Sequence, residues 1–218
     1  MKQQSVSIHK YLSLKAAPEG RESIFLGAVK QLEVLGSIWP WFGRVYSRFF
    51  YSRMLSDEIA FSGINPGMRV LHVGCGPLPM TALALAAFGV GVTAADLDQQ
   101  ALFRAQNVLD ASDYKDRVSL ISGCGSRLDY SGYDAVWMSL HVHPVQQTLN
   151  RAMEMISPGG RIVLRGPKGW LCRYYPRVAK LLPENGFECI QKNQMLGKKS
   201  IVLIKNIPEK KSGADEKG

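Results

Sequence analysis

The stretch that most constrains the fold of this chain is residues 70–98, where two apolar strands flank a glycine-rich turn and a short helix. The first strand is expected at residues 69–73 and runs into Gly74-Cys75-Gly76, and the second strand ends on Asp96. A strand–turn–helix–strand unit of this kind is the repeating element of a doubly wound α/β sheet. In such sheets, ligands bind at the carboxyl ends of the strands, so the same stretch also predicts where a site would lie.

The turn and the acid together indicate an adenosine-bearing ligand. Glycine has no Cβ, so a ligand can lie against the backbone there, and Asp96, twenty residues after Gly76, can accept from ribose hydroxyls. Pro79 suits the first position of the following helix, whose unpaired N–H groups favour an anion. The third glycine of a dinucleotide turn is absent, and Pro77 and Pro79 remove two donors, so a diphosphate would be poorly held. A structural turn that binds nothing is the alternative reading.

Two motifs carry a resemblance to a known group of enzymes. Residues 70–102 resemble the S-adenosyl-L-methionine (SAM) site of class I methyltransferase-fold enzymes, and residues 76–79 are similar to the Gly-Pro-Leu-Pro turn of nicotianamine synthases. Residues 162–169, followed by residues 174–176, are similar to the strand-Arg-x-x-x-Gly segment of those synthases and its later Tyr-Pro. The resemblance covers about residues 70–205.

The resemblance implies SAM as the cofactor and assigns site residues. The expected cofactor contacts come from the turn and the following strand ends: Gly74, Cys75, Gly76, Pro77, Asp96, Leu97, Cys124, Ser139 and Leu140. Arg165 and Tyr175 are the expected substrate-binding residues. Tyr46 and His141 are the candidates for a catalytic role.

The sequence departs from the usual pattern at two strand ends. His72 occupies the position of the acid that commonly orients the amino group of the cofactor. After the third strand, where an acid often accepts from the adenine amino group, the chain has Gly123-Cys124-Gly125. Asp96 therefore remains the principal cofactor contact, with Asp98 as a substitute.

The remaining periodicity predicts a class I methyltransferase-like α/β domain, a Rossmann-like sheet with helices on both faces and a closing strand hairpin. Helices are expected at residues 99–111 and 145–156, and strands at residues 118–122, 133–139, 161–164, 187–192 and 200–205. We place this domain at residues 67–206. Residues 207–218 are polar and charged, which predicts a disordered tail.

Residues 1–66 are predicted to form an N-terminal helical cap. Helices are expected over residues 20–36 and 41–61, and the second carries an aromatic stripe formed by Phe42, Tyr46, Phe49 and Phe50. Packing of this stripe on the sheet domain is the favoured interpretation. A substrate lid and a helix bound to a membrane surface are the alternatives.

Composition narrows the class of protein. The chain has 218 residues, 46% of them hydrophobic, and four widely spaced cysteines without a C-x-x-C pair, which argues against a disulfide framework and a structural zinc site. There is no signal-type apolar segment at the start, so we expect a cytoplasmic protein.

The net charge of +9 comes without a nucleic-acid-binding motif, so nucleic acid is not an expected partner. His141 and His143 lack an evident third ligand, so no metal is expected.

These observations predict a SAM-dependent transferase acting on a small molecule that is derived from an amino acid. The resemblance to nicotianamine synthases favours transfer of the 3-amino-3-carboxypropyl group to an amine. Methyl transfer to a small molecule or lipid is the alternative, and a non-catalytic SAM-binding or membrane-surface protein is the third hypothesis.

Overall fold

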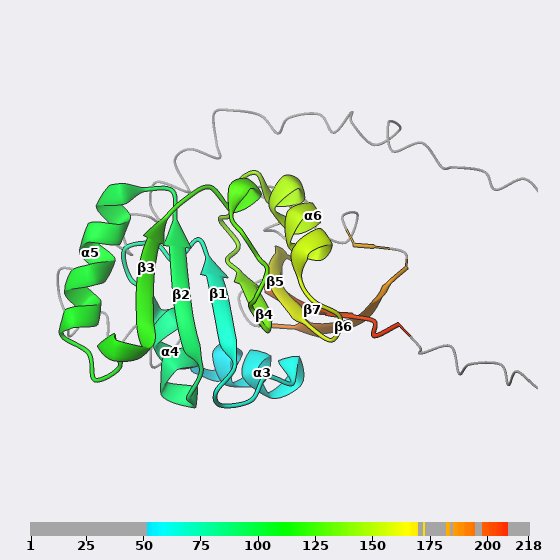
Figure 1. Ribbon diagram of the computed structural model, residues 1–218, viewed down its shortest axis with the longest axis horizontal. Coiled ribbons are helices and arrows are strands. Elements are labelled where there is room, and N and C mark those ends of the chain that lie inside the picture. The colour runs from blue at the N-terminus through cyan, green and yellow to red at the C-terminus, as the bar shows by residue number, and fades with distance from the viewer. Residues whose placement is uncertain (1–51, 170–171, 173–181, 184, 195–197, 209–218) are drawn as a thin grey trace, which may run out of the picture.

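The structure is a computed structural model that describes residues 52–169, 172, 182–183, 185–194 and 198–208. Its centre is a seven-stranded sheet with the strand order β3-β2-β1-β4-β5-β7-β6 (Figure 1). The strands are β1 (Arg69–Val73), β2 (Gly91–Asp96), β3 (Val118–Ser122), β4 (Ala135–Met138), β5 (Arg161–Pro167), β6 (Phe187–Asn193) and β7 (Lys198–Lys205). The α-helices are α3 (Ser52–Ser62), α4 (Met80–Phe88), α5 (Gln99–Asp110) and α6 (Val145–Met155). Two 3₁₀ turns, η3 (Lys115–Arg117) and η4 (Gly125–Arg127), flank β3.

The sheet is parallel except at one strand. The strands β1 to β5 pair in parallel, β7 runs antiparallel to β5, and β6 returns antiparallel to β7. The order reverses at β1, which pairs with β2 on one side and with β4 on the other. The carboxyl ends of these strands therefore form a crevice at a topological switch point, where open α/β sheets bind their ligands.

Each face of the sheet buries its own apolar layer, because alternate residues of a strand point to opposite faces. One layer gathers Val70, Ala94 and Trp137 with the buried side of α4, and Ile59 of α3 packs against it. The other gathers Leu71 and Val136 with the buried side of α6. Figure 1 shows α6 in front of the sheet and α4 behind it. The sheet thus has helices on both faces, as the sequence predicts.

Capping residues define the ends of the two helices near the site. The Asp98 side chain caps α5 by accepting from the backbone N–H groups of Gln100 and Ala101, at 3.0 and 3.3 Å. Gly89 ends α4 in the left-handed conformation at φ 107°, which glycine adopts without a Cβ penalty. Pro79 lies at the N-cap of α4, so the helix begins one residue later than the sequence suggests.

The expected strands are present with small differences in length. The fourth strand is shorter than expected and ends at Met138, whereas the fifth continues to Pro167, because β7 pairs with it along its whole length. Strands β6 and β7 form the expected closing hairpin. Of the proposed N-terminal cap, the structure describes only α3 onward, and the aromatic stripe around Tyr46 and the tail after residue 208 lie outside the described residues.

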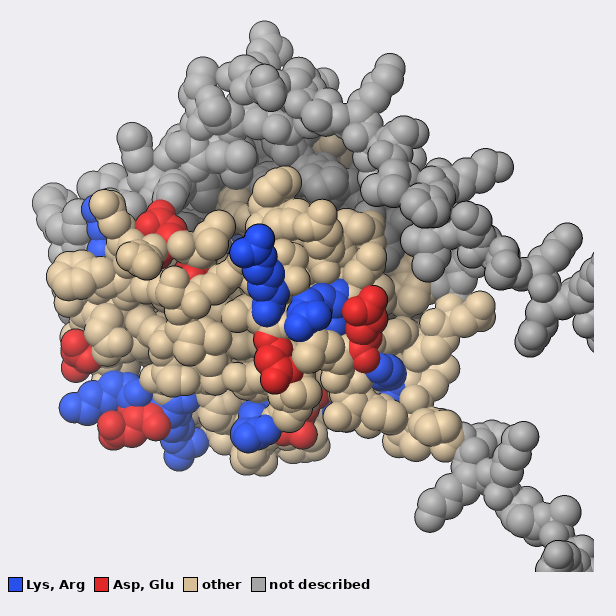
Figure 2. Space-filling view, turned by 45° about the horizontal axis from the view of Figure 1, so that its top comes forward, with Lys and Arg blue, Asp and Glu red and all other residues tan. Residues whose placement is uncertain are grey.

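Positive and negative side chains are interspersed on the face of the described residues that Figure 2 shows. Figure 2 shows Lys and Arg side chains next to Asp and Glu side chains, separated by uncharged surface. On this face the positive charges do not merge into one continuous basic surface. No helix among the described residues is long and apolar enough to span a bilayer.

Candidate functional site

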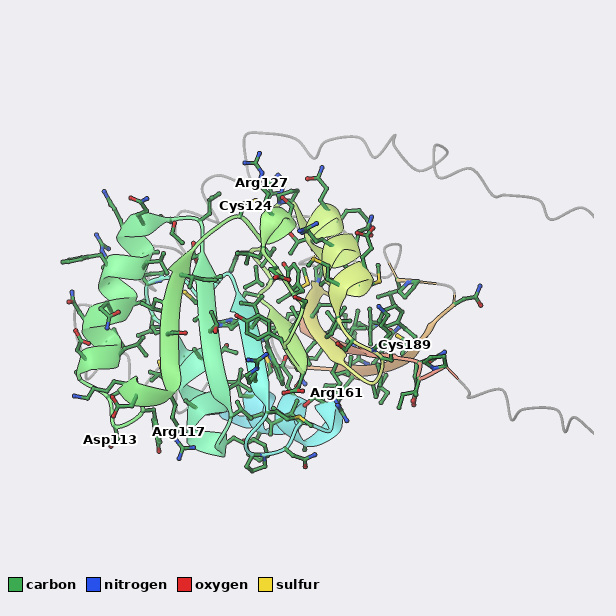
Figure 3. All side chains as sticks on the ribbon, in the orientation of Figure 1. Asp113, Arg117, Cys124, Arg127, Arg161 and Cys189 are labelled. Carbon is green, nitrogen blue, oxygen red and sulfur yellow. The ribbon has the colours of Figure 1, made fainter. Side chains whose placement is uncertain are left out.

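A cavity of about 340 Å³ opens at the carboxyl ends of the parallel strands. Most of its walls come from the β1–α4 turn, the segment after β2, the segment after β3 and the loop after β4, with Arg165 of β5 and Lys198 of β7 at one side. Figure 3 shows Cys124 at this end of the sheet and Arg117 and Arg161 at the opposite end. The cavity therefore lies where the sequence places a ligand.

All nine residues expected to bind the cofactor line this cavity. They are Gly74, Cys75, Gly76, Pro77, Asp96, Leu97, Cys124, Ser139 and Leu140. His141 and Arg165 also line it. Tyr46 and Tyr175, the remaining candidates, lie outside the described residues.

The glycine turn brings backbone to the cavity wall. Gly74 has φ +78°, a conformation that L-residues with side chains rarely adopt, and a Cβ there would lie 2.9 Å from Val142. The N–H groups of Gly74 and Cys75 both donate to the carbonyl of Ala95, at 2.8 and 3.1 Å. The turn is thus fixed against β2, and a ligand can approach the backbone where a side chain would not fit.

Asp96 organises the turn as well as facing the cavity. Its Oδ2 accepts from the N–H of Gly76 at 2.7 Å, and its Oδ1 accepts from the N–H of Asp98 at 3.0 Å. A carboxylate has about four acceptor sites, so two fixed hydrogen bonds leave capacity for hydroxyl donors of a ligand. The side chain of Asp98 is instead engaged in capping α5. Asp96 is therefore better placed than Asp98 to bind ribose.

The segment after β3 supplies a thiol at the position where an acid is often found. The Sγ of Cys124 lies 3.2 Å from the hydroxyl oxygen of Ser126. Hydrogen bonds from the side chain and backbone of Ser126, with the nearby Arg127 charge, lower the pKa of the Cys124 thiol. The N–H of Gly123 donates to the carbonyl of Asp96 at 3.0 Å, which ties this segment to β2.

His72 is a buried, neutral imidazole in the wall of the cavity. Its side chain is 1% exposed, and its Nε2 lies 3.0 Å from the hydroxyl of Ser139. Burial, together with the positive charge of Arg165, lowers the pKa of His72 to about 3. The other ring nitrogen, Nδ1, has no hydrogen-bond partner among the described residues.

A buried ion pair next to the cavity is the feature that sequence reasoning missed. Glu58 of α3 is fully buried, and its carboxylate accepts from Arg165 through Nε at 2.9 and 3.2 Å and through Nη2 at 2.6 Å. Trp137 Nε1 and the Ser200 hydroxyl also donate to it, at 3.1 and 2.6 Å. Arg165 Nη1 in turn donates to the hydroxyl of Thr81 at 3.1 Å. We call these five residues the Glu58 cluster.

The charge state of Glu58 follows from its partners. Burial alone would raise its pKa, but attraction to Arg165 and the hydrogen bonds from Arg165, Ser200 and Trp137 together lower it. The pair is thus ionised and compensated within the protein. Arg165, which the resemblance assigns to substrate binding, lines the cavity with most of its charge already opposed by Glu58.

No local sequence signal marks Glu58 as special. It follows Asp57 on an amphipathic helix, and paired acids at such positions are usually solvent-exposed. Its partners lie 79, 107 and 142 residues away along the chain. Only the folded arrangement of α3 against the sheet brings them together.

The two histidines after β4 do not share a strand face, because β4 ends at Met138. Both residues line the cavity. Loss of solvent around the ring and the charge of Lys198 lower the pKa of His141 to about 4. Within the part of the chain that the structure describes, no three His, Cys, Asp or Glu side chains are grouped as a metal site would require.

Part of this sequence and its fold are similar to those of known proteins. Residues 70–160 match a family described as "Methyltransferase domain". MtNAS in complex with MTA and tNA has a similar fold, with TM-score 0.71 and 20% identity over 84% of this chain and 74% of that chain. A mutant of MtNAS in complex with S-adenosylmethionine gives TM-score 0.70 and 19% identity over 85% and 76% of the two chains.

A methyltransferase has the same architecture over a smaller share of the chain. Magnesium protoporphyrin IX methyltransferase from Synechocystis PCC 6803, with bound SAM, gives TM-score 0.58 and 18% identity over 71% of this chain and 79% of that chain. No curated protein sequence is significantly similar to this chain. The fold is therefore the class I methyltransferase fold, as expected from the sequence.

The residues present fit SAM. Gly74 leaves the space that a Cβ would fill, Asp96 retains acceptor capacity at the end of β2, and His72 Nδ1 is a buried polar atom in need of a partner. The match to a methyltransferase domain supports SAM as the cofactor.

Proposed function

We propose that this protein is a SAM-dependent transferase that moves the 3-amino-3-carboxypropyl group of SAM to an amine of a small, amino-acid-derived acceptor. The observation that carries the proposal is the cavity formed by the Gly74–Pro77 turn and Asp96. The turn continues into the Gly-Pro-Leu-Pro sequence that resembles nicotianamine synthases. We also propose that it acts in the cytoplasm.

Bound SAM supplies a sulfonium centre whose attached carbons are open to attack, with a neutral thioether as leaving group. The protein therefore needs little acid catalysis and must mainly hold the reacting groups in line. The turn and Asp96 would hold the adenosine end, and the loop after β4, which also lines the cavity, would border the acceptor. An attacking amine must be unprotonated. His141, with a pKa of about 4, stays neutral near pH 7 and can accept a hydrogen bond from such an amine.

Transfer of the amino-acid arm is favoured by the extent of the structural likeness. The likeness to MtNAS covers 84% of this chain, whereas the likeness to the magnesium protoporphyrin methyltransferase covers 71%. That MtNAS structure is a complex with MTA, the nucleoside expected when the amino-acid arm leaves SAM. At 20% identity this likeness concerns the fold, so the choice of carbon rests on the shared turn sequence as well.

Methyl transfer is the second candidate. It is favoured by the match of residues 70–160 to the methyltransferase domain family. The acceptor would then be a small molecule or a lipid, and the nucleoside product would be S-adenosylhomocysteine. Fold alone does not decide between the two reactions, because one fold supports many chemistries.

The nucleoside product distinguishes the two candidates. We expect the purified protein, incubated with SAM and a mixture of amino acids and polyamines, to release 5′-methylthioadenosine faster than a protein-free blank. The blank is needed because SAM decays slowly to the same nucleoside. Asp96→Ala serves as the inactive control. Protein-dependent formation of S-adenosylhomocysteine would instead establish methyl transfer and overturn our first choice.

A further inference from the structure

The outer edge of β6 is the longer of the two edges of the described sheet. β6 ends the strand order, and β7 is its one partner among the described strands. It has seven residues and no proline, whereas β3 at the other edge has five residues. Figure 1 shows the two edges on opposite sides of the sheet. A strand edge presents backbone N–H and C=O groups with which another chain can pair, so a long edge requires an explanation.

The hairpin of β6 and β7 indicates which backbone groups face outward. The N–H of Gln194 donates to the carbonyl of Lys198, and the N–H of Asn206 donates to the carbonyl of Gly186, both at 2.9 Å. Hydrogen-bonded pairs alternate along an antiparallel ladder, so the even-numbered residues of β6 direct their backbone groups toward β7. The odd-numbered residues direct theirs to the outer edge, and they are Phe187, Cys189, Gln191 and Asn193.

The even-numbered side chains of β6 share one face of the sheet and carry opposite charges at its two ends. Ile190, in the middle, packs against the apolar layer that also contacts α3. Lys192 pairs with Asp57 of α3 and remains 48% exposed, and Glu188 is exposed. An acid and a base therefore lie two residues before and two residues after Ile190 on the same face.

This pattern is self-complementary in one register. If two β6 strands pair in antiparallel fashion about a two-fold axis at Ile190, Glu188 of each copy lies opposite Lys192 of the other copy. The odd-numbered residues then form the hydrogen-bonded pairs, and the charges fall at the positions between them, where opposite side chains are closest. A register centred on Cys189 or on Gln191 instead places one of the charged residues opposite Ile190.

The other edge of the sheet has no comparable pattern. The sequence of β3 is VSLIS, so no charged side chain defines a register there. Opposite charges directly across two strands stabilise their pairing, and like charges oppose it. The distribution of charge thus favours β6 over β3 as the edge to which a second copy binds.

We propose that β6 is a self-association surface, at which a second copy of this chain pairs its own β6 antiparallel to the first and continues the sheet. The inference does not depend on the proposed function. No described residue of β6 lines the cavity, so pairing at this edge leaves both cavities accessible. The contact is small by the standard of stable dimers, so we expect a dissociation constant of about 10–100 µM.

Reversal of the charge at one position tests the surface. Sedimentation of the full chain should show a reversible monomer–dimer equilibrium. In Glu188→Lys, two attractive pairs become two repulsive ones, so the dissociation constant should rise about tenfold or more. Asp113→Lys makes the same change of charge at an exposed residue, which Figure 3 shows on the side of the sheet away from Cys189, and it should have no effect.

A mixture of two variants tests the register. Lys192→Glu should weaken association of the protein with itself, as Glu188→Lys does. When the two variants are mixed, both charge pairs across the axis are attractive again, so a heterodimer should form with nearly the affinity of the unaltered protein. Circular dichroism of each variant alone shows whether it is folded.

Disulfide formation gives a second, independent test of the register. In the proposed pairing the two Ile190 Cα atoms lie about 4.5 Å apart, within the range that a disulfide spans. The two Cys189 residues lie diagonally, about 7–8 Å apart, which is too far. Ile190→Cys with Cys189→Ser should therefore form a cross-linked dimer under mild oxidation, and the unaltered protein should not cross-link through Cys189. Peptide mass spectrometry identifies the linked residues.

Three results would overturn the inference. The first is an unaltered protein that stays monomeric well above the expected dissociation constant. The second is a dimer that Glu188→Lys weakens no more than Asp113→Lys does, which would place the interface elsewhere. The third is a mixture of the charge variants that does not associate, or cross-linking through Cys189 in place of residue 190, either of which would contradict the register.

Discussion

The glycine turn and the Glu58 cluster both adjoin the cavity, yet they are built in different ways. The turn reaches its partner across a short stretch of sequence, since Gly76 and Asp96 lie 20 residues apart. The cluster joins α3, α4, β4, β5 and β7, and its hydrogen bonds to Glu58 cross 79 to 142 residues. The turn and the half-buried carboxylate of Asp96 line the cavity, whereas the polar groups of the cluster bind one another.

We therefore expect the turn to determine ligand affinity and the Glu58 cluster to determine stability. A change to the carboxylate that supports the turn should mainly alter ligand affinity, because Asp96 lines the cavity and retains acceptor capacity. A change in the cluster should mainly alter stability, because removal of one partner leaves a charge buried without compensation. The predictions below test that division, from the largest expected effect to the smallest.

Glu58→Ala should cause the largest loss of stability. It leaves the Arg165 guanidinium buried without its carboxylate partner, and the free energy of unfolding should fall by about 3–5 kcal/mol. Chemical denaturation followed by circular dichroism measures this. The control is the double variant Glu58→Leu with Arg165→Met, which should lose much less, because no charge remains buried. A loss under about 1 kcal/mol in Glu58→Ala would show that the cluster does not stabilise the fold.

Asp96→Ala should have the largest effect on binding. It removes the acceptor expected for the ribose hydroxyls and the support of the Gly76 N–H, so SAM affinity should fall by at least about 100-fold. Asp98→Ala is the matched control, since it removes the cap of α5 and should cost about 1 kcal/mol of stability with a much smaller change in affinity. Equal calorimetric affinities for the unaltered protein and Asp96→Ala would contradict the assigned site.

The contrast also explains how much could be predicted from the sequence. The turn, Asp96 and the alternating strands could be predicted because each depends on residues close together in the chain, and strand and helix periods are local. Glu58 could not, because its role depends on the docking of α3 against β5 and β7, which no local pattern encodes. The pairing of Arg165 with Glu58 depends on the same docking, whereas its predicted role in substrate binding stays a prediction.

Gly74→Ala should reduce both stability and SAM affinity. The new Cβ requires a residue at φ +78° and lies 2.9 Å from Val142, so we expect a loss of about 2 kcal/mol in the free energy of unfolding. Gly91→Ala is the control, because Gly91 has no positive φ and a Cβ there meets nothing within 4 Å. That variant should stay within about 0.5 kcal/mol of the unaltered protein. Similar losses of stability in both variants would show that the positive φ of Gly74 and the contact with Val142 do not cause the effect.

Stability should fall as the pH is lowered from 6.5 to 5. The folded-state pKa of His72, about 3, lies below its usual value of 6.5, so the unfolded chain binds the additional proton in this range. The expected loss from this residue is about 1.5 kcal/mol, and it should be missing in His72→Phe. His141 shifts in the same direction but is present in both proteins, so the difference between the two denaturation series isolates His72. Parallel pH curves would contradict a buried neutral imidazole.

The smallest effect on stability is expected for the ion pair of Asp57, the residue that precedes Glu58 in α3. Asp57 pairs with Lys192 of β6 at 3.2 Å, but the two side chains are 34% and 48% exposed, so water and salt screen their attraction. The Nζ of Lys192 also lies 5.9 Å from the ring centroid of Phe61. We expect Asp57→Ala to change the free energy of unfolding by less than about 1 kcal/mol, and less again at high salt. A loss comparable to that of Glu58→Ala would mean that contact between α3 and the sheet, rather than burial of the charge, sets the importance of the cluster.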